Sequence, residues 1–375
     1  MDFDRPVTRS GTASYKWDKY GEGVLPLWVA DMDFASPPAV VAALRARADH
    51  GVYGYARLPD SLVEAVYTHL DERYGWKIRP SWIVWLPSVV PGLNLACGAL
   101  AAPGEAVMTV TPVYPPFLTA PANQARRLIA VPATVSGGRW RLPLEAMEAA
   151  VTPDTRVFLL CHPHNPLGRA WSAEEVAAVL DFCRRHDLIL CSDEIHCDLI
   201  LDDVAHVPAA AAADDTAGRV VTLMAPSKTF NLPGLNFAFA VVADPELRKR
   251  YMQPAAGLFP MPGCFAVAAA EAAYRDGSGW LEELLEYLRG NRDLLESFVA
   301  EELPRLRLTH VEATYLAWLD VREAPVVDAA GACLHEGLAL SAGADFGDPG
   351  YLRLNFACTR ATLQEALRRL HAALA

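Results

Sequence analysis

Short apolar runs alternate along the chain with segments of helical periodicity. The runs at 106–110, 157–161, 188–191 and 220–224 are nearly continuous in apolar residues, a pattern typical of strands buried on both faces of a parallel sheet. Helical patterns lie between them, and one follows a capping box formed by Ser172 and Glu175. The alternation predicts an α/β fold in which a mostly parallel sheet is wrapped by helices.

The last part of the chain has a different order of elements. A long amphipathic pattern covers 280–303, and strands are predicted at 315–319 and 351–356 before a closing helix that reaches about Leu374. This order indicates a smaller α+β domain. The expected division of the chain is an N-terminal segment that packs with the small domain, a large domain, and the small domain, at residues 1–45, 46–254 and 255–375.

Three of the predicted strands end in residues that can carry chemistry. Ser227 and Lys228 follow one strand, Asp193 and His196 a second, and Asn165 a third. Because the carboxyl ends of parallel strands meet at one edge of a sheet, these side chains are expected to converge. An amine, a carboxylate and an amide in one place are what a pyridoxal phosphate (PLP) site requires.

Each residue type has a physical reason in such a site. Lys228 can hold PLP as a Schiff base, and Asp193 can keep the pyridine nitrogen of the ring protonated. Asn165 and His196 can donate to the phenolic oxygen, and Tyr114, on a loop after the strand at 106–110, can cover the ring face. Taken alone, each has an ordinary structural explanation, such as a solvated lysine at a strand end. The combination favours the cofactor.

The phosphate of PLP needs a separate anion site. Ser88, Val89 and Val90 precede an apolar helical stretch at 93–100, and the amides at a helix N-terminus bind anions. The hydroxyl of Ser227 is a further predicted donor. The ordinary alternative for 88–90 is a plain turn from strand to helix.

Eight motifs, by their order and spacing, resemble those of fold-type I PLP enzymes of the aminotransferase class I/II superfamily. Within it, the chain is most similar to the MalY/PatB group of cystathionine β-lyases, which are carbon–sulfur β-lyases. The signatures ADMDF and DEIH favour this group over ordinary aminotransferases, which more often carry tyrosine three residues after the aspartate. The motifs are KWDKY (16–20), LWVADMDF (27–34), YGY (53–55), PHNP (163–166), DEIH (193–196), SKTFN (227–231), TYLAWLD (314–320) and RLNFAC (353–358).

The resemblance implies further roles. Arg353 is expected to clamp the substrate α-carboxylate, with Asn165, Tyr114 and Ala30 also beside the substrate. Tyr55 is expected to reach the phosphate of the neighbouring subunit, so the implied assembly is a homodimer with shared active sites. The chain departs from the family pattern at residue 236, where many relatives have a phosphate-binding arginine and this chain has asparagine, and in the loop 341–350, which is shorter and more acidic.

Composition narrows the partners and the compartment. A net charge of −12 argues against nucleic acid and anionic membranes. The chain has no apolar run long enough to span a membrane and no apolar signal-peptide core near its start, which predicts a cytoplasmic protein. Its eight cysteines form no C-x-x-C pair, so reduced core thiols are expected rather than disulfides or zinc ligands.

The implied reaction is β-elimination from an S-substituted L-cysteine, either cystathionine or another cysteine S-conjugate. Lys228 would remove the Cα proton, and the products would be a thiol, pyruvate and ammonia. Aminotransfer is one alternative; decarboxylation or oxidative deamination of a cysteine S-conjugate is another, favoured if Arg353 does not hold the carboxylate in plane. A PLP-fold transcription regulator would carry a basic winged-helix segment ahead of the enzyme motifs, which here begin by Lys16.

Overall fold

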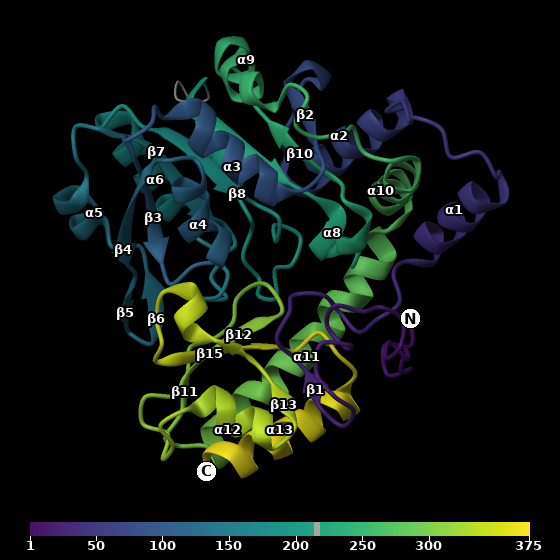
Figure 1. Cartoon of the computed structure of the whole chain (residues 1–375), viewed down its shortest axis with the longest axis vertical. Coiled ribbons are helices and arrows are strands. Elements are labelled where there is room, and N and C mark those ends of the chain that lie inside the picture. Colours follow the sequence, from purple (N-terminus) through teal and green to yellow (C-terminus); the bar gives the residue numbers. More distant parts are fainter. Residues whose placement is uncertain (214–217) are drawn as a thin grey trace.

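A seven-stranded sheet forms the centre of the larger part of the molecule (Figure 1). The computed structural model describes residues 1–213 and 218–375. Five neighbouring strands are parallel, and β10 runs antiparallel to both β9 and β2, so the predicted α/β fold with a mostly parallel sheet is confirmed. In spatial order the strands are β2 (Ile83–Leu86), β10 (Ala238–Val241), β9 (Val220–Met224), β8 (Ile189–Asp193), β7 (Thr155–Cys161), β3 (Ala106–Thr111) and β4 (Arg127–Pro132).

Helices cover both faces of this sheet, which explains why its central strands are apolar at almost every position. Successive residues of β7 point to opposite faces, so Val157 and Leu159 pack with one set of helices and Phe158 and Leu160 with another. The first set is α3 (Val89–Leu100), α4 (Pro115–Asn123) and α9 (Pro245–Met252); the second is α5 (Leu144–Ala150), α6 (Ala173–Arg185) and α7 (Ala209–Ala212). The predicted capping box of α6 is present, with Ser172 Oγ accepting from the Glu175 amide at 3.2 Å.

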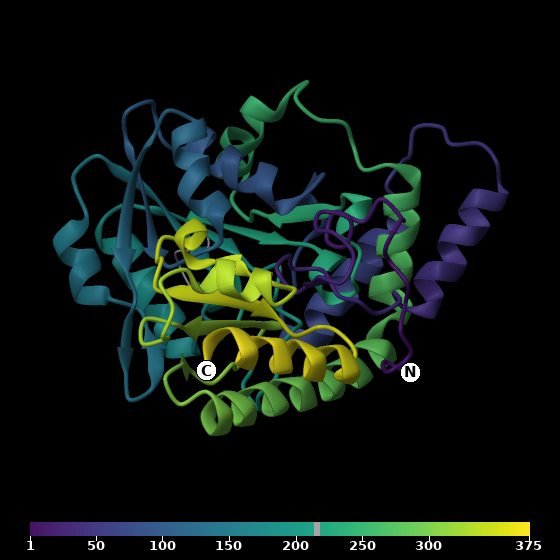
Figure 2. The same ribbon diagram turned by 60° about the horizontal axis from the view of Figure 1, so that its bottom comes forward.

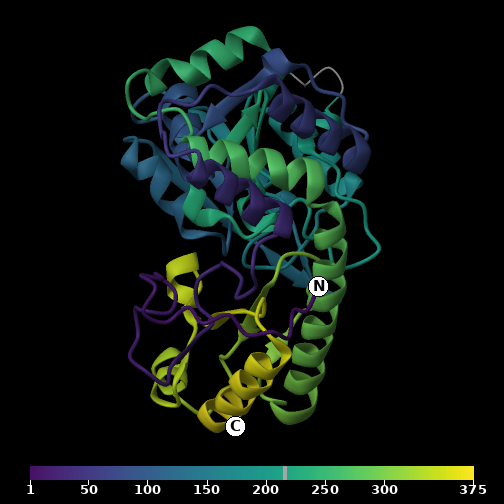
Figure 3. The same ribbon diagram turned by 90° about the vertical axis from the view of Figure 1, so that its right-hand side faces the viewer.

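A smaller part lies below the sheet in Figure 3, and the long helix α11 (Ser278–Glu302) runs from one part into the other. Its antiparallel sheet has the order β11-β12-β15-β14, and α13 lies beside α11 beneath these strands (Figure 2). A short parallel pair joins β1 near the N-terminus to β13. The elements are β1 (Leu25–Pro26), β11 (Arg307–Leu308), β12 (Leu316–Asp320), α12 (Ala329–His335), β13 (Leu338–Ala339), β14 (Ser341–Ala342), β15 (Tyr351–Asn355) and α13 (Arg360–Leu374).

The N-terminal residues pack with the smaller part, whereas the helix that follows residue 255 packs with the larger part. Phe3, Leu27 and Phe34 share one apolar cluster with α11 and α13. In contrast, α10 (Cys264–Asp276) contacts α1 (Pro38–Asp49) and α2 (Asp60–Tyr74), next to β10. The expected domain boundaries near residues 45 and 255 stay a prediction. In the described ranges, no helix is long and apolar enough to cross a membrane.

A buried ion cluster joins the larger and smaller parts. Arg169, which is 1% exposed, donates to both oxygens of Glu175 at 2.9 and 2.6 Å and also pairs with Glu312, from the segment before β12. Arg139, at the start of β6 (Arg139–Arg141, paired with β5, Thr134–Ser136), binds the other oxygen of Glu312 at 2.5 Å. Loss of the Arg169 guanidinium would leave Glu175 without a cationic partner among the described residues and Glu312 with Arg139 alone, so buried negative charge would be poorly compensated.

Replacing Arg169 is therefore expected to destabilise the fold strongly. Arg169→Met should lower the free energy of unfolding by about 3–5 kcal/mol, as for other broken buried ion pairs. Urea unfolding followed by circular dichroism measures this. The matched control is Arg184→Met, which removes an arginine from a solvent-exposed pair with Asp181 and should have a much smaller effect. Equal losses in the two variants would contradict the assignment.

Candidate active site

The cavity with the predicted chemistry lies where the carboxyl ends of β7, β8 and β9 meet the N-terminus of α3 and the small part. Its volume is about 290 Å³. It is lined by eleven of the twelve residues assigned from the sequence to the cofactor or the substrate: Ala30, Ser88, Val89, Val90, Tyr114, Asn165, Asp193, His196, Ser227, Lys228 and Arg353. The twelfth, Tyr55, lies fully exposed on the extended segment between α1 and α2, outside the cavity.

Lys228 enters the cavity from the short helix α8 (Pro226–Thr229), which follows β9 directly. Its Nζ donates to the main-chain carbonyl of Ala30 at 2.6 Å. Burial lowers the pKa of Lys228 to about 8, and the positive charge of Arg353 acts in the same direction, against the opposing effects of Asp31 and Asp193. A lysine with this pKa has a substantial fraction of neutral amine near neutral pH, as a nucleophile or a general base needs.

Asp193 is the last residue of β8, and its carboxylate is buried beside the cavity. Its Oδ1 accepts from the amide of Ile195 at 3.1 Å, and no cation among the described residues forms an ion pair with it. Burial raises the pKa of Asp193 to about 7, although the nearby charge of Lys228 opposes the shift. A buried carboxylate without a counter-ion suits a protonated ring nitrogen placed in the cavity.

Three polar side chains complete the middle of the cavity. The amide of Tyr114 donates to the carbonyl of Asn165 at 3.0 Å, which joins the loop after β3 to the loop after β7. Asn165 Oδ1 accepts from Arg353, so its Nδ2 is the group left to donate. His196 is 2% exposed, its Nδ1 has no partner in the described structure, and burial lowers its pKa far below the usual value, so the imidazole is neutral.

Arg353, on β15, is a buried cation held only by neutral acceptors. Nη1 donates to Asn165 Oδ1 at 3.1 Å, and Nη2 donates to the carbonyl of Trp28 at 2.7 Å and to Ser341 Oγ at 3.3 Å. Its guanidinium lies 4.6 Å from the ring centre of Phe346. Burial lowers the pKa of Arg353 to about 10, and no carboxylate of the described residues pairs with it. This geometry leaves the guanidinium ready for an anion.

The N-terminus of α3 forms the anion end of the cavity. Ser88 is its N-cap residue but makes no side-chain cap bond, and the first amides of the helix lack intrahelical partners. Ser227 and Asn236 line the same cavity. Asn236 has a left-handed backbone with φ of 51°. A phosphate here would meet amides, hydroxyls and an asparagine in place of the arginine that many relatives carry.

Several residues around the cavity were not predicted to belong to it from local sequence patterns. Cys161, Pro233 and Phe237 contribute to its wall, and Trp28 and Ser341 hold Arg353. Trp28 lies far from Arg353 in the sequence and accepts through its main-chain carbonyl, whereas Ser341 accepts through its hydroxyl. Neither group marks a residue as part of a binding site. Only their presence in the family motif at 27–34 and in the loop 341–350 points toward the site.

Fold and site together define a PLP-type enzyme site, and the chain belongs to the aminotransferase class I and II family, whose sequence profile matches residues 22–370. It is 40% identical to the cystathionine β-lyase PatB of Bacillus subtilis, over 100% of both chains. Among solved structures, it is similar to OvoB, with a TM-score of 0.97 and 41% identity over 100% of this chain and 99% of that one. The PLP-bound C-S lyase of Staphylococcus hominis has a TM-score of 0.94 and 29% identity, covering 100% and 98%. The resemblance drawn from the motifs is confirmed.

The raised pKa of Asp193 predicts a pH-dependent gain in stability when its charge is removed. The folded pKa of about 7 lies above the ordinary aspartate value of about 3.8. The contribution of this group to folding stability is therefore present in full below about pH 4 and is lost as the pH rises through 7. Asp193→Asn should therefore stabilise the PLP-free protein at pH 8, and the gain should shrink toward pH 5.

Urea unfolding at several pH values measures this difference. Asp187→Asn is the control, because the carboxylate of Asp187 is 82% exposed. A gain for Asp193→Asn that does not change with pH, or a loss at pH 8, would show that the carboxylate is compensated in the folded protein.

Proposed function

We propose that this protein is a PLP-dependent carbon–sulfur β-lyase. Its substrate would be an S-substituted L-cysteine, either cystathionine or another cysteine S-conjugate, and the products a thiol, pyruvate and ammonia. The proposal is supported by full-length similarity to proteins named cystathionine β-lyase and C-S lyase. It is supported independently by the charges of the cavity.

The residues present fit PLP. Lys228 offers an amine of lowered pKa, the unpaired carboxylate of Asp193 suits the ring nitrogen, and the N-terminus of α3 suits the phosphate. Asn165 Nδ2 and the neutral His196 are donors for the ring oxygen, and Tyr114 is the aromatic group for the ring face. When bound, PLP supplies an electron sink for the pair released at Cα.

The observation that carries the proposal is the buried Arg353 without an anionic partner. A guanidinium matches a carboxylate with two parallel hydrogen bonds, so Arg353 would bind the α-carboxylate of an amino acid and fix its plane. Arg353 and Lys228 line the same cavity, which places the clamp and the base on one substrate. Holding the carboxylate in a fixed plane also protects the bond to it from breaking.

Lys228 would then act as the general base at Cα. It takes the Cα proton, the Cβ–S bond breaks, and the sulfur leaves as a thiolate that becomes the thiol product. Addition of water to the remaining three-carbon fragment yields pyruvate and ammonia. Aminotransfer, named in the family description, would use the same Lys228 and Arg353, but would need a 2-oxo acid and would release no thiol.

A homodimer with shared sites is also part of the proposal. Two segments without helix or strand, at 51–59 and 256–263, carry unusually exposed apolar side chains, including Tyr53, Tyr55, Leu258 and Met261. Exposed apolar clusters of this kind are typical of protein interfaces. In a symmetric dimer, Tyr55 would enter the phosphate end of the partner's cavity, as the resemblance implies.

A cytoplasmic location completes the proposal. All eight cysteines are free thiols, and seven of them are buried. Unpaired cysteines in the core suit a reducing compartment.

Replacement of Arg353 tests which bond breaks. Arg353→Ala should raise KM and lower kcat, with kcat/KM falling about 100-fold or more, because both binding and Cα–H alignment depend on the guanidinium. Arg353→Lys should restore little, since an ammonium cannot pair in a bidentate way. The assay follows thiol, pyruvate and carbon dioxide from one S-substituted cysteine.

The parent protein should form thiol and pyruvate in equal amounts without carbon dioxide. The control is Arg322→Ala, whose arginine is 62% exposed. Stoichiometric carbon dioxide from the parent would refute the lyase and favour a decarboxylase, and formation of a 2-oxo acid only with an amino acceptor would favour an aminotransferase.

Mixing two inactive variants tests the shared site. Tyr55→Ala and Lys228→Ala should each have little activity alone. If Tyr55 serves the partner's Lys228, mixed dimers contain one intact site, and an equal mixture should recover about a quarter of the parent activity. Mixing Lys228→Ala with Arg353→Ala is the control and should recover nothing, because both residues belong to one cavity. No recovery in the first mixture would contradict the role of Tyr55.

A further inference from the structure

A segment without helix or strand, Val29–Asp33, passes directly over Lys228. The carbonyl of Ala30 accepts two hydrogen bonds, from Lys228 Nζ at 2.6 Å and from Tyr315 Oη at 3.1 Å. This main-chain oxygen is the only acceptor among the described residues that hydrogen bonds the amine of Lys228. Where the amine points therefore depends on where this segment lies.

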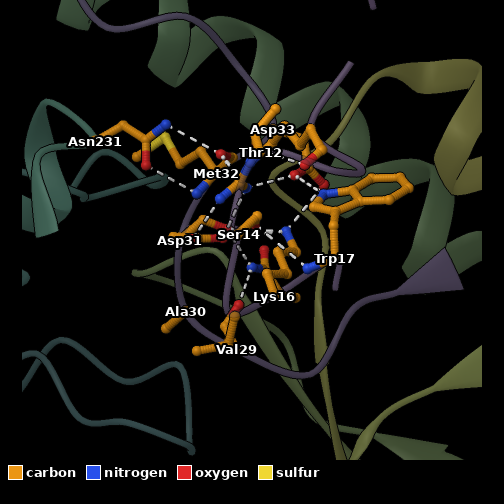
Figure 4. Close-up of polar contacts among 12 residues, drawn as sticks. Thr12, Ser14, Lys16, Trp17, Val29, Ala30, Asp31, Met32, Asp33 and Asn231 are labelled. Carbon is orange, nitrogen blue, oxygen red and sulfur yellow. Dashed lines mark hydrogen bonds and ion pairs between the residues drawn. The ribbon is translucent and has the colours of Figure 1, made fainter. Parts of the chain in front are cut away.

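Side chains from distant parts of the chain hold the main chain of the segment. Asn231, three residues after Lys228, accepts from the amide of Met32 and donates to its carbonyl, both at 3.0 Å. Asn355 donates to the carbonyls of Val29 and Asp31, both at 2.7 Å. Asn231 thus ties the loop of Lys228 to the segment that carries its acceptor (Figure 4).

Two cations, Arg9 and Lys16, hold the same segment through its carboxylates Asp31 and Asp33. Arg9 spans two carboxylates, with Nη2 2.7 Å from Asp31 Oδ2 and Nη1 2.7 Å from Asp33 Oδ1. Lys16, fully buried, lies 2.9 Å from Asp33 Oδ2 and donates to the carbonyl of Asp31 at 3.0 Å. Trp17 Nε1 donates to Asp33 at 2.8 Å (Figure 4). Two cations and two anions compensate one another, so the cluster has no charge left for a ligand.

The chemistry of an amine explains why such a hold matters. A neutral lysine has two N–H groups and one lone pair, and the lone pair must point at the Cα proton when Lys228 acts as a base. Donating one N–H to a fixed carbonyl limits rotation about the last side-chain bond and therefore restricts the direction of the lone pair. A carbonyl on a loose segment could not do this.

We propose that Arg9 and Asn231 are positioning residues that hold the carbonyl of Ala30 against Lys228 and thereby aim its amine at the Cα proton. The inference rests on the proposed function, in which Lys228 is the base. Neither residue lines the cavity, and both act through the Val29–Asp33 segment. The first residues of the chain thus become part of the proton-transfer apparatus.

Two variants and a matched control test this. Arg9→Met removes the guanidinium, and Asn231→Gly removes the side chain while tolerating the φ of 56° at this position. The control is Arg292→Met. Arg292 is a buried arginine that, like Arg9, binds two aspartates, Asp202 and Asp293, and one main-chain carbonyl, but it lies on α11 outside the cavity. All are studied as the PLP-loaded enzyme.

The two readouts are amide hydrogen exchange and the isotope effect at Cα. Peptides that cover 29–33 should exchange faster in Arg9→Met and Asn231→Gly than in the parent, and Arg292→Met should leave them unchanged. In Arg9→Met and Asn231→Gly, kcat should fall about 10- to 100-fold relative to the parent, with KM little changed. The primary isotope effect, measured with substrate deuterated at Cα, should be larger than in the parent because proton transfer becomes slower. Arg292→Met should keep the parent's isotope effect.

Two results would overturn the inference. Faster exchange at 29–33 with an unchanged kcat and isotope effect would show that the segment does not aim Lys228, and unchanged exchange with unchanged kinetics would show that Arg9 and Asn231 do not hold it. If the parent enzyme transfers the amino group of the substrate and releases no thiol, the lyase proposal fails. Aminotransfer removes the same Cα proton, so the isotope effect on 2-oxo-acid formation would still test the positioning of Lys228.

Discussion

Desolvation of charge in one cavity is the constraint on which the site depends. Asp193 and Arg353 are buried and Lys228 is partly buried, and burial is the largest influence on the pKa of each. Burying an ionised group without a partner is unfavourable by several kcal/mol. The cavity that holds them lies between two large apolar clusters, one built around the central strands and the other around the smaller part.

The charges of this protein divide into two kinds. Around Arg169, and around Arg9 with Lys16, buried cations are matched by carboxylates, and these clusters join segments distant in sequence. In the cavity, Asp193 and Arg353 have only neutral partners. A matched cluster is complete without a ligand. The unmatched carboxylate complements a cofactor with a cationic ring nitrogen, and the unmatched guanidinium complements a substrate with an anionic carboxylate. Charge balance therefore identifies the site more sharply than cavity shape.

The sequence predicted those parts of the site that follow from local patterns. Lys228, Asp193 and Asn165 come just after continuous apolar runs, and parallel strands bring such positions together whatever the loops do. The hold on Val29–Asp33 could not be predicted in the same way. Asn231 and Asn355 hold this segment by side-chain hydrogen bonds to main-chain atoms that lie 199 and 324 residues away in the sequence. Such bonds produce no periodic pattern in the sequence. Tyr55 shows the other limit, since the chain alone places it in solvent and a second copy is needed to test its role.

The charges of Arg353 and Lys228 influence each other inside the cavity. The positive charge of Arg353 is one of the causes that lower the pKa of Lys228. A carboxylate bound to Arg353 would cancel much of that charge, so substrate binding should weaken one of the two causes that lower the pKa of Lys228. Asp31 acts on Lys228 in the same direction as the bound carboxylate, so the N-terminal segment that holds the amine also contributes to its basicity.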